Sequence, residues 1–239
     1  MNSKHAIVIG INNYKINPLK GCINDANKIS NYLENNNNYN VHLLLNNNAT
    51  KQNIINKINE LLTIKHTITN LVFFFSGHGS LLPKYYNNLL NIIYTFDFFD
   101  NSYNMFFSDF ELFSLLLKFE YNTKIEVVLD RCHDIYNSNN NILNDTKSIK
   151  VMGDRNIERL ESTGVLNYNK EINNRIIRWS SSKNKEISVD RKFEFGFNGV
   201  FTFHLLKLVD NCNTRQKLFW EIKKSLRELP TTTRAVGFW

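Results

Sequence analysis

Two short segments of this chain carry the side chains best suited to covalent chemistry. One is Ser76-Gly77-His78-Gly79 and the other is Asp130-Arg131-Cys132-His133, and each follows an apolar run. A Cys with a His nearby is the smallest set of side chains that can catalyse acyl transfer to a thiol. The thiolate attacks a carbonyl carbon, and the imidazole takes up a proton and later gives it to the leaving amine. Cys132 and His78 are therefore the candidate catalytic residues.

The glycines beside the histidine suit the same chemistry. Gly77 and Gly79 let the backbone turn sharply around His78. The amides of Gly79 and Cys132 are candidate hydrogen-bond donors to the oxyanion that forms during acyl transfer. Each fragment also has a purely structural interpretation, because a His between glycines often serves a turn and a Cys that ends a strand is often a small buried hydrophobe.

Short apolar runs alternate with helical patterns along the chain. Strands are predicted at His5–Ile11, Val41–Leu45, Leu71–Phe75, Ile92–Phe96, Ile125–Leu129 and Arg175–Ser180, with a closing edge strand within Thr231–Trp239. Helices are predicted at Ile23–Leu33, after a Thr50 cap, from Ser108 to Phe119, and at Val200–Val209 and Arg215–Leu229. This alternation predicts an α/β domain with a mostly parallel sheet and helices on both faces. Sites in such sheets form beyond the carboxyl ends of the strands, where His78 and Cys132 would meet if their strands are neighbours.

Composition excludes several classes of protein. The 239 residues are 42% hydrophobic and 13% aromatic, which excludes a disordered chain. No apolar run is long enough to span a membrane, and three irregularly spaced cysteines fit neither a disulfide framework nor a zinc module. We expect a soluble, cytoplasmic monomer without a membrane partner.

The net charge of +7 is unevenly distributed. Residues 1–146 carry 11 Lys and Arg against 12 Asp and Glu, whereas residues 147–239 carry 18 against 10. Such asymmetry can mark a nucleic-acid surface, but no groove-binding or single-strand-binding motif accompanies it. Nucleic acid is therefore a rival partner that we do not expect.

Four sets of residues together resemble the metacaspases, a family of caspase-like cysteine peptidases. They are Gly10-Ile11-Asn12, Leu19-Lys20-Gly21-Cys22-Ile23-Asn24-Asp25, Phe75 to Gly79, and Asp130 to His133. Weaker matches follow at Trp179-Ser180-Ser181 and Asn198-Gly199-Val200-Phe201-Thr202. The resemblance implies a caspase-like three-layer sandwich over residues 1–239. It divides the chain into a large-subunit-like part (1–136), a linker or insertion loop (137–174) and a small-subunit-like part (175–239).

The resemblance also implies an activity, the hydrolysis of protein or peptide substrates after Arg or Lys by Cys132 and His78. Asp25 and Asp130 match the positions that hold the basic side chain, and two carboxylates suit the fork of a guanidinium. Each carboxylate has a structural alternative, a helix cap for Asp25 and an ion pair for Asp130. Cys22 is expected to pack against the sheet.

The chain departs from the family pattern around the expected nucleophile. Arg131 stands where the family has a small residue, and Asp134-Ile135 replace a Ser-Gly pair. Arg131 could favour the Cys132 thiolate by its charge. It could instead lie across the carboxylates and block the pocket, and the chain would then be an impaired pseudoenzyme that acts as a binding or regulatory module.

The resemblance leaves calcium as a candidate cofactor and implies no organic cofactor. The candidate oxygen ligands for calcium are Asp97, Asp100, Asp109 and Glu111. Self-processing is a further expectation, because the segment 137–174 carries several basic residues: Lys147, Lys150, Arg155, Arg159 and Lys170. The alternative for that segment is an uncut surface loop.

Overall fold

The structure is a computed structural model that describes residues 2–83, 89–98, 106–131, 175–181, 190–194, 196–227 and 237–238. Its centre is a six-stranded sheet in the order β11-β8-β7-β3-β1-β2. The parallel strands are β1 (Ser3–Gly10), β2 (Asn40–Leu45), β3 (Ile68–Ser76), β7 (Lys124–Asp130) and β8 (Ile176–Ser180). The short β11 (Gly237–Phe238) pairs antiparallel with β8 at one edge. The predicted mostly parallel sheet is confirmed.

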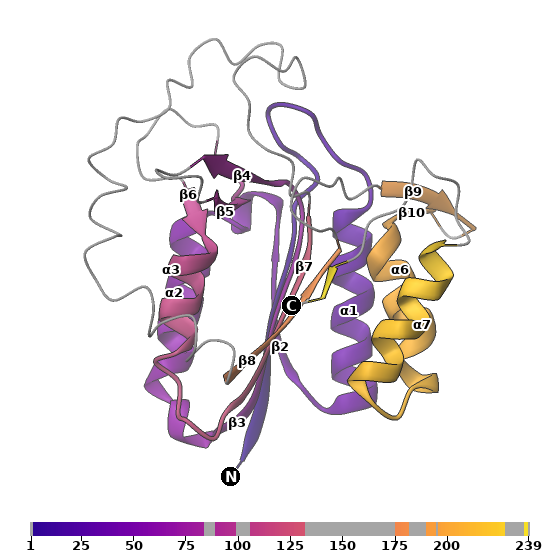
Figure 1. Cartoon of the computed structure of the whole chain (residues 1–239). Helices are drawn as coiled ribbons and strands as arrows, with labels where there is room; N and C mark the ends of the chain where they lie inside the picture. Colours follow the sequence, from indigo (N-terminus) through magenta and orange to yellow (C-terminus); the bar gives the residue numbers. More distant parts are fainter. Residues whose placement is uncertain are drawn as a thin grey trace.

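Helices cover both faces of this sheet (Figure 1). One face carries α1 (Cys22–Asn37), α6 (Val200–Leu208) and α7 (Arg215–Arg227), and the other carries α2 (Lys51–Thr63) and α3 (Asp109–Leu116). Single turns of 3-10 helix follow three of these elements: η1 (Asn46–Asn48), η2 (Lys65–Thr67) and η5 (Val209–Asn211). Alternation along β3 explains the layers, since Phe73 and Phe75 pack toward α2 and α3 while Phe74 packs toward α1 and α6.

Two helices begin at the residues that the sequence predicts. The Thr50 Oγ1 accepts a hydrogen bond from the Asn53 amide at 3.2 Å, and the Ser108 Oγ accepts one from the Glu111 amide at 3.1 Å. Each hydroxyl satisfies an amide that has no partner within its helix. The second helix is shorter than predicted, because α3 ends at Leu116 and not at Phe119.

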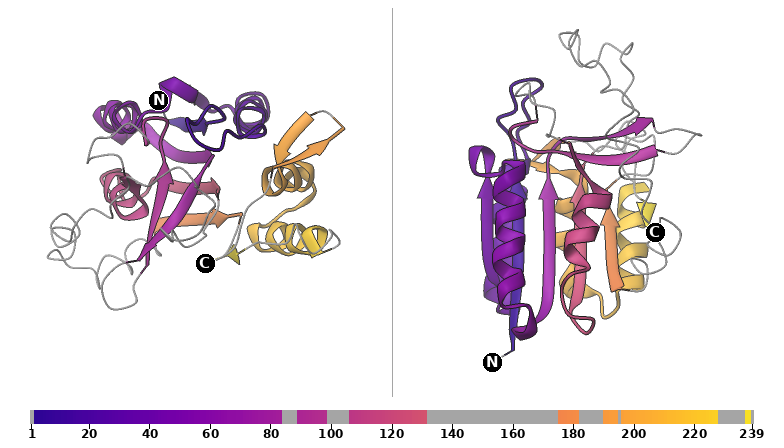
Figure 2. Two further views of the ribbon diagram at one scale, coloured as in Figure 1. Left: turned by 90° about the horizontal axis from the view of Figure 1, so that it is seen from above. Right: turned by 90° about the vertical axis from the view of Figure 1, so that its left-hand side faces the viewer.

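Two small antiparallel units stand beyond the carboxyl ends of the parallel strands (Figures 1 and 2). One is the sheet of β4 (Gly79–Pro83), β5 (Leu89–Tyr94) and β6 (Phe106–Ser108), and the other is the pair β9 (Asp190–Phe193) and β10 (Gly196–Gly199). The sequence predicts only one of these strands, at Ile92–Phe96, which the structure places at β5. Because β3 ends at Ser76 and β4 begins at Gly79, His78 lies between the central sheet and the β4–β5–β6 sheet.

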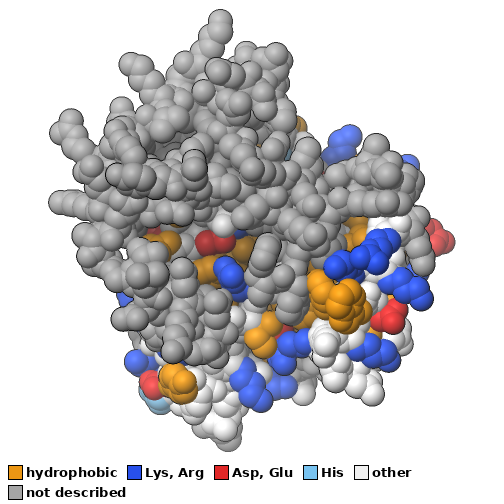
Figure 3. Space-filling view, in the orientation of Figure 1, with side chains coloured by type: hydrophobic (Ala, Val, Ile, Leu, Met, Phe, Trp, Pro, Cys, Tyr) orange, Lys and Arg blue, Asp and Glu red, His pale blue; other side chains and the backbone are white. Residues whose placement is uncertain are grey.

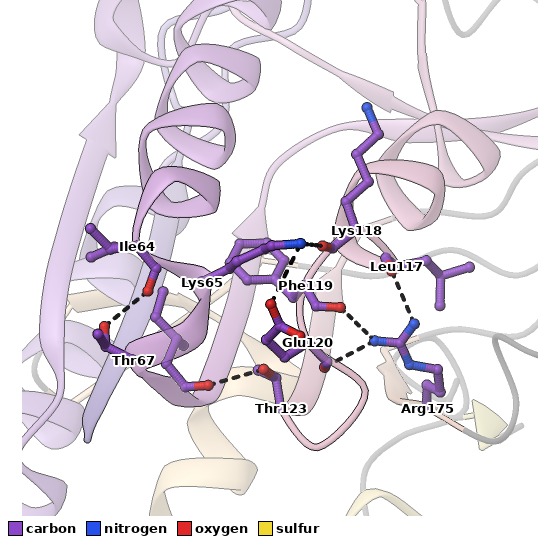
Figure 4. A network of polar contacts seen from close by, with 10 residues as sticks. Ile64, Lys65, Thr67, Leu117, Lys118, Phe119, Glu120, Thr123 and Arg175 are labelled. Atoms are coloured by element: carbon purple, nitrogen blue, oxygen red, sulfur yellow. Dashed lines mark hydrogen bonds and ion pairs between the residues drawn. The ribbon is translucent and has the colours of Figure 1, made fainter. Parts of the chain in front are cut away.

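At the opposite end of the sheet, Arg175 holds the start of β8 against the turn before β7 (Figure 4). Its guanidinium donates hydrogen bonds to the carbonyls of Leu117 at 2.9 Å, Phe119 at 2.9 Å and Glu120 at 3.0 Å. The Thr123 hydroxyl donates to the Ile68 carbonyl at 2.9 Å, which ties the same turn to β3. This network joins the described chain before residue 132 to the described chain after residue 174. The predicted linker and its cleavage sites lie between them, outside the described residues.

The basic C-terminal half includes α7. On this side of the molecule, hydrophobic side chains lie beside Lys and Arg (Figure 3). Trp220 is 53% exposed, and the Lys223 ammonium lies 4.9 Å from its ring centroid. Nothing in this arrangement identifies a partner, so the expectation about nucleic acid stays untested. Among the described residues, no helix combines the length and the apolar character needed to cross a bilayer.

Candidate active site

The strands that lead to the two candidate catalytic residues are neighbours. β3 and β7 pair in parallel with Ser76 opposite Asp130, and the Gly77 amide donates to the Asp130 carbonyl at 3.2 Å. His78 is the second residue after Ser76, and Cys132 is the second residue after Asp130. The adjacency on which the predicted pair depends is therefore present. Cys132 and His133 themselves lie outside the described residues, so their catalytic assignment stays a prediction.

The partly exposed imidazole of His78 has a defined hydrogen-bond partner. Its Nε2 lies 2.6 Å from the carbonyl oxygen of Asn17, which can only accept, so Nε2 carries the proton and Nδ1 is the basic nitrogen. The pKa of His78 is lowered by burial, against the opposing effects of the Asn17 carbonyl and the Asp190 charge. His78 is therefore neutral at pH 7 and able to accept a proton.

The backbone of His78 is held by Tyr14. The His78 amide donates to the Tyr14 hydroxyl at 3.0 Å, and that hydroxyl donates to the Tyr94 carbonyl at 2.9 Å. The rings of Tyr14 and His78 also pack, with centroids 4.6 Å apart. The buried phenol thus joins His78 to β5, a role that the sequence did not indicate.

Asp25 is completely buried in the first turn of α1. It accepts hydrogen bonds from the Ser76 hydroxyl at 2.9 Å, the Asn198 side-chain amide at 2.8 Å and the Gly199 amide at 2.9 Å. The N-cap of α1 is Gly21, and the first amides of the helix, those of Cys22 and Ile23, donate to the Asn12 side-chain oxygen at 2.9 and 3.3 Å. The helix-cap alternative for Asp25 is therefore wrong.

Asp130 approaches the same backbone from β7. Its Oδ2 accepts hydrogen bonds from the Thr202 amide at 3.1 Å and the Thr202 hydroxyl at 2.6 Å. A Cβ placed on Gly199 would collide with Asp130 Oδ2 and would lie 2.9 Å from Asp25 Oδ2. The pKa of Asp25 is raised well above its usual value, first by burial and then by the charge of Asp130. The structure thus brings the two predicted specificity residues together, but their binding of substrate stays a prediction.

A third carboxylate, Asp190, was missed by the sequence reasoning. It begins β9, and its Oδ2 accepts hydrogen bonds from the amides of Lys20 at 3.1 Å and Gly21 at 2.8 Å. Burial raises the pKa of the Cys22 thiol and the charge of Asp190 adds to that rise, while the same charge opposes the lowering of the pKa of His78. No apolar pattern or motif marks this position, because the residue reaches the site only through the β9–β10 pair.

Two cysteines of the chain lie within the described residues. Cys22 is 2% exposed at the start of α1, and burial raises the pKa of its thiol well above the usual value. This placement agrees with the expected packing role. Cys212 is free and partly exposed, between η5 and α7.

Arg131 extends to the face of the sheet opposite Asp25. Its buried guanidinium donates to both oxygens of Asp109, at 2.8 and 3.0 Å, and to the Ile92 carbonyl at 3.1 Å. Asp109 opens α3, whereas Asp25 belongs to α1 on the other face. The alternative in which Arg131 lies across the two carboxylates and blocks the pocket is therefore wrong.

The predicted calcium ligands are engaged with other groups. Asp109 pairs with Arg131, Glu111 pairs with the Lys51 ammonium at 2.9 Å, and Asp97 Oδ1 accepts from the Lys51 amide at 3.0 Å. Asp100 lies outside the described residues. In the part of the chain that is described, no three His, Cys, Asp or Glu residues form a cluster that could hold a metal ion. Asp97, Asp109 and Glu111 do not fit a shared calcium site, and calcium binding stays an untested prediction.

Gly79 contacts Arg131 at the start of β4. It pairs with Ile93, and a Cβ at this position would lie 2.6 Å from Arg131 Cδ and 2.9 Å from the Ile92 carbonyl oxygen. Only glycine fits there without a shift of its neighbours. The contribution of the Gly79 amide to an oxyanion hole stays a prediction.

The structure is a three-layer α/β fold with a histidine and clustered carboxylates beyond the ends of its parallel strands. The model of the caspase domain matches residues 3–235, so the chain belongs to the caspase family of cysteine peptidases. The protein GSU0716 from Geobacter sulfurreducens has a similar structure, with a TM-score of 0.67 and 18% identity, over 99% of this chain and 92% of that one. Caspase-1 from Spodoptera frugiperda is similar at a TM-score of 0.59 and 11% identity, over 94% of this chain and 77% of that one. At these identities the likeness shows the fold alone. No curated protein matches the chain significantly.

Proposed function

We propose that this chain is a cysteine endopeptidase of metacaspase type that hydrolyses peptide bonds after Arg or Lys. Cys132 attacks the scissile carbonyl, and the amides of Gly79 and Cys132 stabilise the oxyanion. The acyl-enzyme is then hydrolysed by water. The neighbouring positions of β3 and β7 and the family of the chain support this assignment.

His78 is the proton carrier in this proposal. The Asn17 carbonyl keeps the Nε2 proton in place and leaves the Nδ1 lone pair to accept the thiol proton. The same nitrogen then protonates the leaving amine. Because the pKa of His78 is lowered, the neutral base is present at pH 7, and kcat/KM should fall at a pH below the ordinary histidine value of about 6.5.

The observation that carries the specificity proposal is the burial of two carboxylates side by side. Asp25 and Asp130 are 0% and 4% exposed, and each repels the ionised form of the other. A guanidinium or ammonium that enters beside them relieves this repulsion and gains charge-assisted hydrogen bonds. A substrate Asp would add a third negative charge, so this site selects against it.

Asp190 extends the same negative field toward His78. The Lys20 and Gly21 amides donate to Oδ2 of Asp190, and the residue is partly exposed. We include it as a third group that attracts the basic side chain of the substrate. Its contribution is electrostatic, because the two amides already hold it in position.

Peptide hydrolysis provides the first test. Purified chain should cleave fluorogenic peptides that end in Arg or Lys and leave matched Asp peptides intact, while Cys132→Ala and His78→Gln should lose at least about 1000-fold in kcat/KM. Cys132→Ala compared with wild type on a gel also tests whether the segment 137–174 is cut by the chain itself. If the wild-type protein cleaves none of these peptides and Cys132 fails to react with iodoacetamide at neutral pH, the pseudoenzyme interpretation replaces this proposal.

A further inference from the structure

The residue before the expected nucleophile is fixed by the backbone that follows β8. The Arg131 amide donates to the Ser181 hydroxyl at 3.0 Å, and the same hydroxyl donates to the Arg131 carbonyl at 3.0 Å. The Ser181 amide in turn donates to the Leu129 carbonyl at 3.0 Å. One serine thus holds both polar backbone groups of Arg131, the last described residue before the expected nucleophile.

The side chain of Arg131 is fixed as firmly as its backbone. The guanidinium binds both oxygens of Asp109 and the Ile92 carbonyl, and none of the side chain is exposed. Its Cδ lies against Gly79, the residue after His78, where a Cβ would come within 2.6 Å of that carbon. A single side chain therefore links the segments of both predicted catalytic residues to α3 and β5.

Stability alone does not account for this pair. A buried ion pair often stabilises a fold no better than apolar side chains of similar volume, because the desolvation of both charges offsets their attraction. Burial raises the pKa of Asp109, while Arg131 and Arg178 oppose that rise. A small residue at position 131 would avoid this desolvation, so the pair calls for a functional explanation.

We propose that Arg131, held by Asp109, is a positioning residue that sets Cys132 against His78. This inference rests on the proposed function and adds a residue to it. With the guanidinium anchored in α3 and packed under Gly79, the end of β7 and the His78 turn move as one unit. If the anchor is lost, the thiol and the imidazole separate while the strands of the sheet stay in place.

Two variants test this positioning, and neither touches the dyad directly. Arg131→Met keeps the length of the side chain and removes its charge, and Asp109→Asn keeps the shape of the partner and leaves Arg131 charged. We expect both to lower kcat for Arg peptides by about 10- to 100-fold with KM within about twofold, the size of effect that a displacement of about 1 Å produces. The double variant should lose no more than the worse single variant, because the two residues act as one unit.

Alkylation of Cys132 by iodoacetamide, followed on the Cys132 peptide by mass spectrometry, provides a readout that needs no turnover. Paired with His78, the thiol should react with a midpoint pH well below the value of about 8.5 for a free cysteine. Both variants should shift that midpoint upward by about one unit. A shift in Asp109→Asn cannot come from the loss of the Arg131 charge, so it separates positioning from simple electrostatics.

Arg175→Met is the matched stability control, since Arg175 donates to three carbonyls at the opposite end of β8. It should lower the melting temperature without changing the alkylation midpoint or kcat. Folded variants of Arg131 or Asp109 whose midpoint is the same as that of wild type would overturn the proposal. So would equal shifts in Arg175→Met. An inactive wild type whose midpoint still shifts in both variants would refute the proposed function and leave the positioning role standing.

Discussion

The carboxylates of Asp25 and Asp130 come from different elements and converge on Gly199, whose lack of a side chain lets both approach one backbone segment. Asp25 binds Ser76, Asn198 and the Gly199 amide, whereas Asp130 binds Thr202. The hydrogen bonds hold two like charges together in a buried place. The repulsion between the two carboxylates is unfavourable in the free protein, and a bound cation would relieve it.

Asp25→Asn should therefore separate activity from stability. The change removes a charge-assisted hydrogen bond of about 2–3 kcal/mol to a guanidinium, so kcat/KM for Arg peptides should fall about 30- to 150-fold. It also removes a buried like-charge repulsion, so the melting temperature should rise by about 2 °C or more at pH 7. A matched citrulline peptide is the control, because its neutral side chain gains nothing from the Asp25 charge. A variant that is both less active and less stable would contradict this account.

The same pair predicts how stability depends on pH. The pKa of Asp25 is raised in the folded chain, whereas an unfolded Asp ionises near about 3.9. Above that pH, the folded state holds more protons than the unfolded state, so stability should fall as the pH rises until it passes the folded pKa. Melting temperatures measured from pH 4 upward should show Asp25→Asn gaining on wild type. A constant difference across that range would count against the raised pKa.

Asp190→Asn should weaken substrate binding with little effect on the fold. The amide oxygen of Asn can still accept the hydrogen bonds of Lys20 and Gly21, so only the charge is lost. We expect kcat/KM for Arg peptides to fall about 3- to 10-fold through KM, and the melting temperature to stay within about 2 °C. A loss confined to kcat would instead indicate that Asp190 acts mainly on His78.

Tyr14→Phe should damage both stability and catalysis. Without the hydroxyl, the amide of His78 loses the acceptor at 3.0 Å, at about 1–3 kcal/mol for the unsatisfied group, and the hydrogen bond to the Tyr94 carbonyl is lost as well. The Tyr94 amide still donates to the His78 carbonyl at 3.0 Å, but the amide of His78 is no longer held, so kcat should fall about 10-fold. Thermal melting and steady-state kinetics on the same preparation would check both effects. Unchanged kcat in a destabilised variant would reduce Tyr14 to a purely structural role.

Activity should not depend on calcium bound by Asp97, Asp109 and Glu111, so chelation of calcium should leave it unchanged. Arg131 binds both oxygens of Asp109, and Lys51 binds one oxygen each of Glu111 and Asp97, so a cation would have to compete with these contacts. We expect rates in EDTA and in about 1 mM calcium to agree within twofold. Strong activation by calcium that survives Glu111→Gln would place the ligands elsewhere in the chain.

Much of the fold could be predicted from the sequence, because local patterns set it. The apolar runs that became β1, β3 and β7 need only burial on both faces. The Thr50 and Ser108 caps are equally local. The β4–β5–β6 sheet was largely missed, since antiparallel pairing between short strands depends on contacts that no periodicity reveals.

The sequence alone determined which residue types could do chemistry and, through strand ends, that His78 and Asp130 belong at one edge of a sheet. Only the tertiary structure decided the direction of Arg131, which depends on where α3 packs, and the arrival of Asp190, which depends on the β9–β10 pair. It also decided that Asp25 and Asp130 are buried together. These are relations between segments far apart in the chain, and their electrostatic effects follow from distance and burial, which a linear order of residues does not contain.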